Sequence, residues 1–200
     1  MKQRLFLAIP LPQPLQETLT EALAHFQSTL SDKQQEAIRF IPAENWHITI
    51  YFFGDVPVNQ IEWLQKRIEE IVQATPAFVL IPDQLLLSPP EKEVKKMLWL
   101  SFQVLPALTE LSWQVYRNTE EGLHFHETTL AQPRPVLIPH VTVARFKHIS
   151  PEILPLPVVP SLIFNPLLVQ RCELWRSALG EHGALYNPIA EFRFATKLPN

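Results

Sequence analysis

Two short segments of the sequence carry the same residues suited to proton transfer, His47-Ile48-Thr49-Ile50 and His140-Val141-Thr142-Val143. In a β-strand successive side chains point to opposite faces, so each segment would present its imidazole and hydroxyl together and bury its aliphatic pair. One such strand would be read as structural. Chance predicts about 0.08 copies of this pattern in a chain of this composition. Two copies therefore indicate a paired functional site.

The chemistry open to such a pair is acid–base catalysis. An imidazole titrates near neutral pH and can accept or donate a proton. At a cyclic phosphate, a neutral histidine would take a proton from the attacking water, and a protonated histidine would protonate the departing sugar oxygen, so no metal is obligatory. Each such group typically contributes roughly 10²–10⁴-fold, and Thr49 and Thr142 would donate hydrogen bonds to phosphoryl oxygens. Because the two segments are nearly symmetric, the sequence leaves open which histidine is the acid.

The two segments belong to a longer repeat. At a constant offset of 93 residues, Leu5-Phe6-Leu7 aligns with Leu98-Trp99-Leu100 and Leu15 with Leu108, without a gap. Such self-similarity indicates two supersecondary units of the same kind. We therefore predict an α+β fold of two pseudo-symmetric lobes, each an antiparallel β-sheet with outer helices, and a central cleft between the two His-x-Thr strands. Residues 1–200 would form one bilobal domain.

Hydrophobic periodicity predicts the elements that position these residues. Helices are expected behind Pro14, over 61–71 and from near Pro106. Gly54-Asp55 is expected to end one strand in a turn. The expected strands cover 5–9, 46–53, 78–87, 97–104, 162–164, 167–175 and 191–195.

Composition narrows the class of protein. The chain has 200 residues, of which 46% are hydrophobic, enough for a sizeable core. Its formal net charge of −3 argues against a polycation that coats nucleic acid, so any nucleic-acid chemistry should be confined to a local site. No apolar run approaches the roughly 18 residues of a membrane span, and the single cysteine, Cys172, cannot form an internal disulfide. We expect a cytoplasmic protein that does not contact membranes.

Four segments also match a known pattern: Arg4-Leu5-Phe6-Leu7-Ala8; Asn45-Trp46-His47-Ile48-Thr49-Ile50 with Phe52-Phe53-Gly54; Pro139-His140-Val141-Thr142-Val143-Ala144-Arg145; and Leu174 to Tyr186. In these segments the chain resembles the two-histidine (2H) phosphoesterases. Within that superfamily it is similar to the bacterial and archaeal RNA 2',3'-cyclic phosphodiesterases, once described as 2'-5' RNA ligases. The resemblance covers nearly the full length.

The resemblance implies hydrolysis of RNA 2',3'-cyclic phosphate ends to 2'-phosphomonoesters, with His47 as general acid, His140 as general base, and neither cofactor nor metal. The partners it implies are RNA ends, tRNA fragments among them, or cyclic nucleotides, bound by a monomer without an obligate protein partner. Arg145 matches the arginine after the family's second motif, where a guanidinium suits a phosphate. Strict alternation would put Arg145 on the face opposite His140, so a bulge or strand end is required.

Several other residues have more than one interpretation. Tyr51 would share the face of Thr49 by alternation, where it would stack on a base, bond a phosphate or serve as rim packing. Phe6 and Trp99 hold equivalent strand positions, and packing is favoured over base stacking. Cys172 lies in an apolar strand without a nearby base, which favours a buried, inert thiol over a nucleophile.

One further cluster could be mistaken for a metal site. His124, His126 and Glu127 have the look of metal ligands in an extended segment. Because no further ligands follow at a recognisable spacing, a solvated loop is favoured. The charged run at 91–96 is typical of an exposed turn whose lysines could approach an RNA strand.

Two other functions stay open from the residues alone. The first is a related two-histidine esterase that acts on a small cyclic nucleotide or a nucleotide-sugar cyclic phosphate, or that ligates 2'-5' ends. The second is a non-catalytic module that binds RNA ends without turnover. The intact histidines, threonines and arginine favour an enzyme over the binding module.

Overall fold

The computed structural model describes residues 1–88, 97–123, 136–147, 164–180 and 183–196. The chain combines four α-helices with antiparallel strand pairs in the part that the structure describes, so the α+β class predicted from the sequence is confirmed. The helices are α1 (Gln13–Ser28), α2 (Asp32–Ala37), α3 (Ile61–Ala74) and α4 (Pro106–Leu123). The strands are β1 (Lys2–Pro10), β2 (Ile38–Phe40), β3 (His47–Pro57), β4 (Phe78–Leu80), β5 (Pro82–Ser88), β6 (Met97–Phe102), β7 (His140–Phe146), β8 (Leu167–Val169), β9 (Arg171–Gly180) and β10 (Gly183–Arg193).

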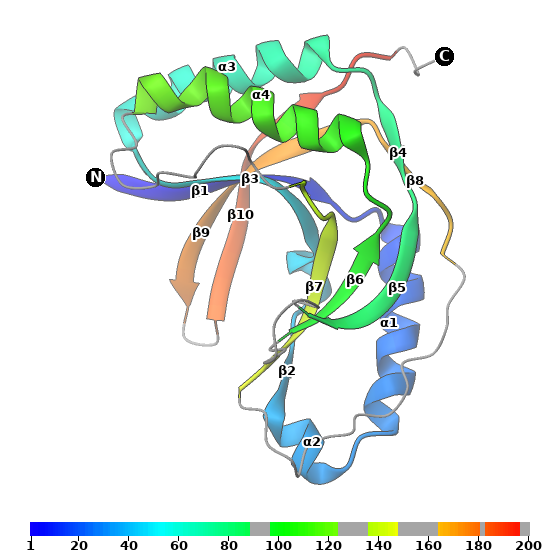
Figure 1. Ribbon diagram of the computed structural model, residues 1–200. Coiled ribbons are helices and arrows are strands. Elements are labelled where there is room, and N and C mark those ends of the chain that lie inside the picture. The colour runs from blue at the N-terminus through cyan, green and yellow to red at the C-terminus, as the bar shows by residue number, and fades with distance from the viewer. Residues whose placement is uncertain (89–96, 124–135, 148–163, 181–182, 197–200) are drawn as a thin grey trace.

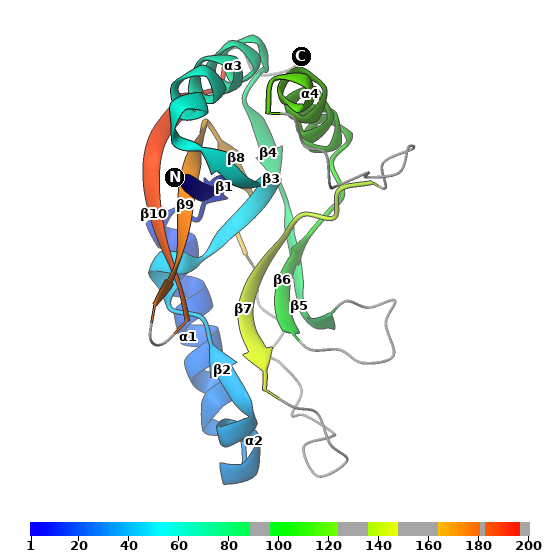
Figure 2. The same ribbon diagram turned by 90° about the vertical axis from the view of Figure 1, so that its left-hand side faces the viewer.

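The main sheet brings the two His-x-Thr strands together at its centre. Its strand order is β10-β9-β1-β3-β7-β6-β5, and β2 also pairs with β7. Strands β3 and β7 share the register pair Ile48–Val141. Beyond this contact the two halves of the sheet diverge, with β1, β9 and β10 on one side and β5 and β6 on the other (Figure 2). The predicted functional segments therefore lie at the junction of the two halves.

A hydrophobic core joins the two halves. The aliphatic pairs of the repeated segments are buried as predicted, with Ile48, Val141 and Val143 at 0% exposure and Ile50 at 2%. These residues belong to one cluster with side chains from β1, β6 and the helices. Burial of each large aliphatic side chain contributes about 1.5–3 kcal/mol, which stabilises the strands that carry the histidines.

Helices α3 and α4 lie side by side across one end of the sheet (Figure 1). Helix α3 contacts β10, and α4 contacts β3. The Ser112 hydroxyl of α4 donates a buried hydrogen bond of 2.8 Å to the Ile50 carbonyl of β3. Helix α4 follows β6 in the chain, so this bond ties one sequence repeat to the His-x-Thr strand of the other.

The predicted strand 46–53 differs from the observed strand at its end. The predicted turn at Gly54-Asp55 is absent. Strand β3 instead continues to Pro57 and stays paired with β1. Gly54 has a φ of 71°, a left-handed conformation that glycine adopts without the steric cost of a Cβ. A register shift lies beside it, between Leu5–Gly54 and Phe6–Phe52. The glycine therefore marks a β-bulge and not a turn.

Two other predicted strands are divided in the structure. Residues 78–87 form β4 and β5, which belong to different sheets, because Pro82 begins a new strand after the exposed Ile81. Residues 167–175 form β8 and the first part of β9, and β9 continues to Gly180. The predicted strand 191–195 overlaps the end of β10, which stops at Arg193 and pairs along β9. Residues 162 and 163 lie outside the described ranges.

The predicted helices are confirmed behind Pro14, at 61–71 and from Pro106. In α1 the buried residues recur at helical spacing, namely Leu15, Leu19, Leu23 and Phe26, and Pro14 stands in the first turn, where its missing N–H costs no hydrogen bond. Among the described residues, no helix combines the length and apolar character needed to cross a membrane.

Candidate active site

The two histidines occupy equivalent positions at the starts of β3 and β7. His47 Nδ1 lies 2.7 Å from the Asn45 carbonyl oxygen, and His140 Nδ1 lies 3.0 Å from the Ile138 carbonyl oxygen. A carbonyl oxygen only accepts hydrogen bonds, so each Nδ1 carries the proton and donates it. In the neutral imidazole, Nε2 then carries the lone pair that can accept a proton. Both histidines line one cleft, so the structure presents two orientated Nε2 atoms for proton transfer.

Aromatic side chains surround the two imidazoles differently. The His47 ring has its centroid 4.9 Å from Phe6, 5.1 Å from Trp175 and 5.3 Å from Tyr186. The His140 ring stacks on Trp99 at 3.6 Å and an interplanar angle of 17°. Phe6 and Trp99 are buried, as the packing interpretation predicted, and both pack against the histidine of their own repeat.

Burial sets the protonation of both histidines. It lowers the pKa of His47 from 6.5 to about 4, against the opposing effect of the Asn45 hydrogen bond. The neighbouring charges of His140 and Arg145 lower the pKa of His47 further. Burial also lowers the pKa of His140, against the Ile138 hydrogen bond and with Arg145 adding to the decrease. Both imidazoles are therefore neutral at pH 7 in the free protein, and a bound phosphate anion would raise both pKa values.

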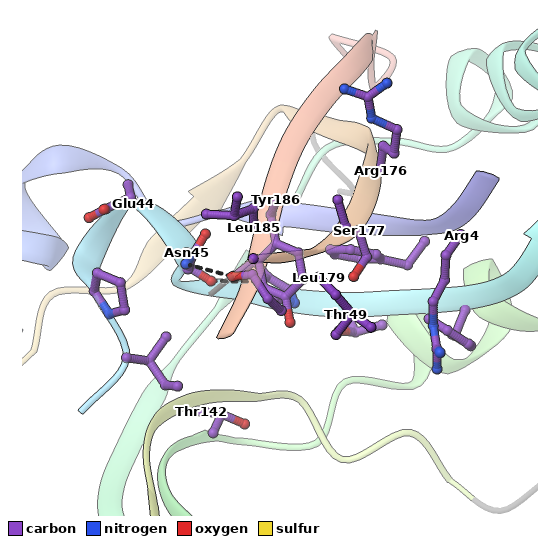
Figure 3. Close-up of a pocket in the computed structure, with 18 of the residues that line it drawn as sticks. Arg4, Glu44, Asn45, Thr49, Thr142, Arg176, Ser177, Leu179, Leu185 and Tyr186 are labelled. Carbon is purple, nitrogen blue, oxygen red and sulfur yellow. Dashed lines mark hydrogen bonds between the residues drawn. The ribbon is translucent and has the colours of Figure 1, made fainter. Parts of the chain in front are cut away.

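The two threonines of the repeat face the same cleft from opposite strands. Thr49 lies on β3 and Thr142 on β7 (Figure 3), and each is two residues from its histidine. Neither hydroxyl hydrogen-bonds to another residue within the described part of the chain. Because a hydroxyl can donate one hydrogen bond and accept two, both are available to the oxygens of a ligand.

Matching β-bulges end the alternation of both strands. On β3 the register passes from Leu7–Tyr51 to Ala8–Thr49, which leaves Ile50 without a partner. On β7 it passes from Leu98–Ala144 to Trp99–Thr142, which leaves Val143 without a partner. After each bulge the next residues exchange faces. The two strands consequently share one burial pattern over seven residues from the histidine.

The bulges decide which side chains reach the cleft. Arg145 is exposed and lines the cleft with His140. Strict alternation would have placed it on the opposite face, and the bulge at Val143 explains why it is not there. The prediction that Tyr51 shares the face of Thr49 is wrong, because the bulge at Ile50 turns Tyr51 into the core. There its ring lies 4.9 Å from Phe53 and 6.3 Å from Tyr116. Phe52 takes the cleft position instead and is 48% exposed.

The cleft is large and positively charged, although the whole chain carries a net charge of −3. Its volume is about 1680 Å³. The β9–β10 hairpin contributes a wall that includes Ser177, Leu179, Leu185 and Tyr186 (Figure 3). Two acidic side chains line the cleft, Glu44 and Asp55, against five basic ones: Lys2, Arg4, Arg39, Arg145 and Arg176. The excess of positive charge favours an anionic ligand.

Cys172, another residue noted in the sequence, does not line the cleft. Cys172 is fully buried, and burial raises the pKa of its thiol, which fits an inert thiol. His124, His126 and Glu127 lie outside the described residues, as does the charged run at 91–96. Within the ranges that the structure describes, no group of three or more His, Cys, Asp or Glu side chains could hold a metal ion.

Sequence reasoning missed several cleft residues. Phe52 is related to Arg145 by the same 93-residue offset that relates the histidines, so the repeat could have identified it. Arg4 lies with its guanidinium carbon 4.9 Å from the Phe52 ring centroid, a contact that no local pattern predicts. Arg39 lines the cleft because β2 pairs with β7. Tyr186 arrives from a strand near the other end of the chain.

Comparisons with known proteins agree with this geometry. Residues 9–99 match the family model described as LigT like Phosphoesterase. RNA 2',3'-cyclic phosphodiesterases of Methanothermobacter thermautotrophicus and Thermotoga maritima are each 22% identical to the chain over 96% of its length, and the matches cover 100% and 95% of those relatives. In these matches the chain is similar to the LigT-like phosphoesterases of the 2H superfamily, in agreement with the resemblance found in its sequence.

Solved structures show the same fold. TT0787 of Thermus thermophilus superposes with a TM-score of 0.77 at 21% identity, over 98% of this chain and 100% of that chain. Escherichia coli LigT in complex with NADP+ gives a TM-score of 0.71 at 22% identity, with the same coverage. LigT crystal structures also contain 3'-AMP or ATP, so a protein of this fold binds nucleotides.

Proposed function

We propose that this phosphoesterase opens 2',3'-cyclic phosphate ends of RNA to 2'-phosphomonoesters by metal-independent acid–base catalysis through His47 and His140. The observation that carries the proposal is the pair of orientated imidazoles in one positively charged cleft, each with Nδ1 bound to a backbone carbonyl and Nε2 free. The RNA 2',3'-cyclic phosphodiesterase activity named for two relatives along almost their whole length supports the choice of substrate.

The reaction needs one proton to leave water and one to reach the sugar. Nε2 of the base takes a proton from a water molecule, whose oxygen forms a bond to phosphorus. The bond from phosphorus to the ribose 3'-oxygen breaks, and Nε2 of the acid protonates that oxygen. The products are a free 3'-hydroxyl and a 2'-phosphomonoester. The two histidines exchange protonation states during the reaction, and a further proton transfer through solvent restores them.

The remaining cleft residues stabilise the negative charge that builds on the phosphoryl oxygens. Thr49 and Thr142 donate hydroxyl hydrogen bonds, and Arg145 supplies a charged, planar donor. Removing one donor of this kind typically costs about 10²–10³-fold in kcat. The uneven surroundings of the two imidazoles do not by themselves assign the acid and the base. The family resemblance makes His47 the acid and His140 the base.

The test is hydrolysis of a short RNA with a 2',3'-cyclic phosphate end, in the presence of EDTA. The wild-type protein should release the 2'-phosphomonoester, and His47→Ala and His140→Ala should each reduce kcat by at least about 10²-fold. His25→Ala is the matched control, because His25 is exposed on α1 outside the cleft. Loss of activity with EDTA, or full activity in both cleft variants, would refute the mechanism.

A small cyclic nucleotide is the second candidate substrate, favoured by the nucleotides in the LigT crystal structures. Cyclic mononucleotides should therefore be assayed beside the oligomer. The assay should also measure 2'-5' ligation, in which a 5'-hydroxyl takes the place of water as the nucleophile. An RNA-end-binding module would bind the oligomer without turnover. Size-exclusion chromatography with light scattering tests the expected monomer, and tRNA fragments with cyclic ends test the proposed cellular partner.

A further inference from the structure

Two arginines face each other across neighbouring strands at one end of the cleft. Arg39 of β2 is the register partner of Arg145 of β7. Both are exposed, and both line the cleft. Directly opposed residues of an antiparallel pair project from the same face with Cβ atoms about 4.5–5.5 Å apart. The structure therefore holds two guanidinium groups on one surface without relying on a flexible loop.

This pairing is unfavourable unless an anion joins it. Like charges directly opposite each other destabilise a sheet. No carboxylate of the described ranges forms a salt bridge with Arg39 or Arg145, and the Arg145 guanidinium donates instead to the Met97 sulfur at 3.4 Å. The cleft's Asp55 is the register partner of Arg4 on β1. The arginine pair is thus available to a ligand.

The position of the pair distinguishes it from the site of proton transfer. Arg145 follows Thr142 by three residues on β7, which corresponds to roughly 10 Å of strand, less the local shortening of the bulge. The Arg145 charge still lowers the pKa of both histidines, so its guanidinium lies within electrostatic range of the scissile phosphate. Arg39 stands opposite Arg145 on the neighbouring strand, so both arginines lie at the same distance along β7 from Thr142. At this distance from the threonine, a phosphate bound between the two arginines would be a second one, next to the scissile phosphate.

We propose that Arg39, together with Arg145, binds the phosphodiester that joins the terminal nucleotide of the RNA to the nucleotide before it. This inference rests on the proposed function and deepens it. A cyclic mononucleotide lacks that phosphodiester, whereas an RNA end always carries it. The arginine pair would therefore make the enzyme prefer oligomer ends to mononucleotides, and Arg39 would be the residue that determines this preference.

The test compares wild type with Arg39→Gln on three substrates that share a 2',3'-cyclic end: an oligomer, a mononucleotide, and a mononucleotide with a 5'-phosphate. For the variant, kcat/KM should fall about tenfold on the oligomer and on the 5'-phosphorylated mononucleotide. On the plain mononucleotide it should change less than twofold. Arg39→Lys keeps the charge and should recover most of the loss. Arg117→Gln is the matched control, because it removes a charge from α4 away from the cleft.

Binding supplies a readout that does not depend on turnover. Each phosphate contact to a single strand contributes about 0.7 to the slope of log K against log salt concentration. For an oligomer ending in a 2'-phosphate, the magnitude of this slope should therefore decrease by about 0.7 in Arg39→Gln. It should stay unchanged in Arg117→Gln. Equal losses on all three substrates, or an unchanged salt slope, would overturn the arginine-pair proposal. Absence of turnover by the wild type with an Arg39-dependent slope would instead overturn the proposed hydrolysis alone.

Discussion

Resistance to acid should depend on His47. Burial lowers the pKa of this imidazole from 6.5 to about 4 in the folded protein. Between these pH values the unfolded chain binds a proton that the folded chain does not. The contribution of His47 to stability is therefore complete above about pH 6.5 and is lost as the pH falls towards 4. A pKa difference of about 2.5, at 1.36 kcal/mol for each pKa unit, amounts to about 3 kcal/mol.

The variant His47→Gln removes this titration and keeps a polar side chain at the position. Its free energy of unfolding at pH 7 will itself differ from wild type, so the informative quantity is the change in that free energy between pH 7 and pH 4. Other groups titrate in both proteins and cancel in the difference. Wild type should lose about 3 kcal/mol more than His47→Gln over this range.

Urea unfolding at several pH values measures this difference, provided that the m-value stays constant between the two proteins. His25→Gln is the matched control, because His25 is exposed on α1 and does not line the cleft. Equal pH dependence in wild type and His47→Gln would show that the imidazole is not desolvated. It would refute the conclusion that burial lowers the pKa of His47.

Four further outcomes are expected. Tyr51→Phe should leave kcat/KM within about twofold, because Tyr51 lies in the core and not in the cleft; a tenfold loss would return it to the substrate site. Thr49→Val and Thr142→Val should each lower kcat by about 10²-fold with little change in KM, measured by steady-state kinetics, since they donate to charge that builds in the transition state. Gly54→Ala should reduce the free energy of unfolding by about 1–2 kcal/mol in urea titrations, because a φ of 71° is unfavourable for a residue with a Cβ. The profile of kcat/KM against pH should be bell-shaped with an optimum below 6.5, because the pKa values of both histidines are lowered; an optimum well above neutral pH would contradict this.

Strand alternation was a reliable guide for only part of each functional strand. It placed His47 with Thr49 correctly, because a period of two follows from the backbone of any extended strand. It failed at Tyr51, because the bulge at Ile50 arises from pairing with β1, a strand about forty residues earlier in the sequence. The Ile50 carbonyl at this bulge accepts a hydrogen bond from Ser112, which is farther away still. Local sequence contains neither contact.

The internal repeat was a better guide than any single motif. It related Phe6 to Trp99, and the structure places each against the histidine of its own repeat. The same offset relates Phe52 to Arg145, and both occupy the cleft after equivalent bulges. Residues related by the repeat share their tertiary surroundings as well as their local conformation, because the two copies fold and pack in the same way.

The sequence by itself determined the α+β class, the helices and the buried aliphatic faces, because these follow from periodicity and burial within short segments. It also identified His47, Thr49, His140 and Thr142 as one repeated pattern. Only the tertiary structure decided which side chains join them, since pairing between distant strands sets the bulges that bring Arg145 to the cleft and turn Tyr51 away. The facing arginines likewise depend on the pairing of β2 with β7, a contact across more than one hundred residues that no local pattern records.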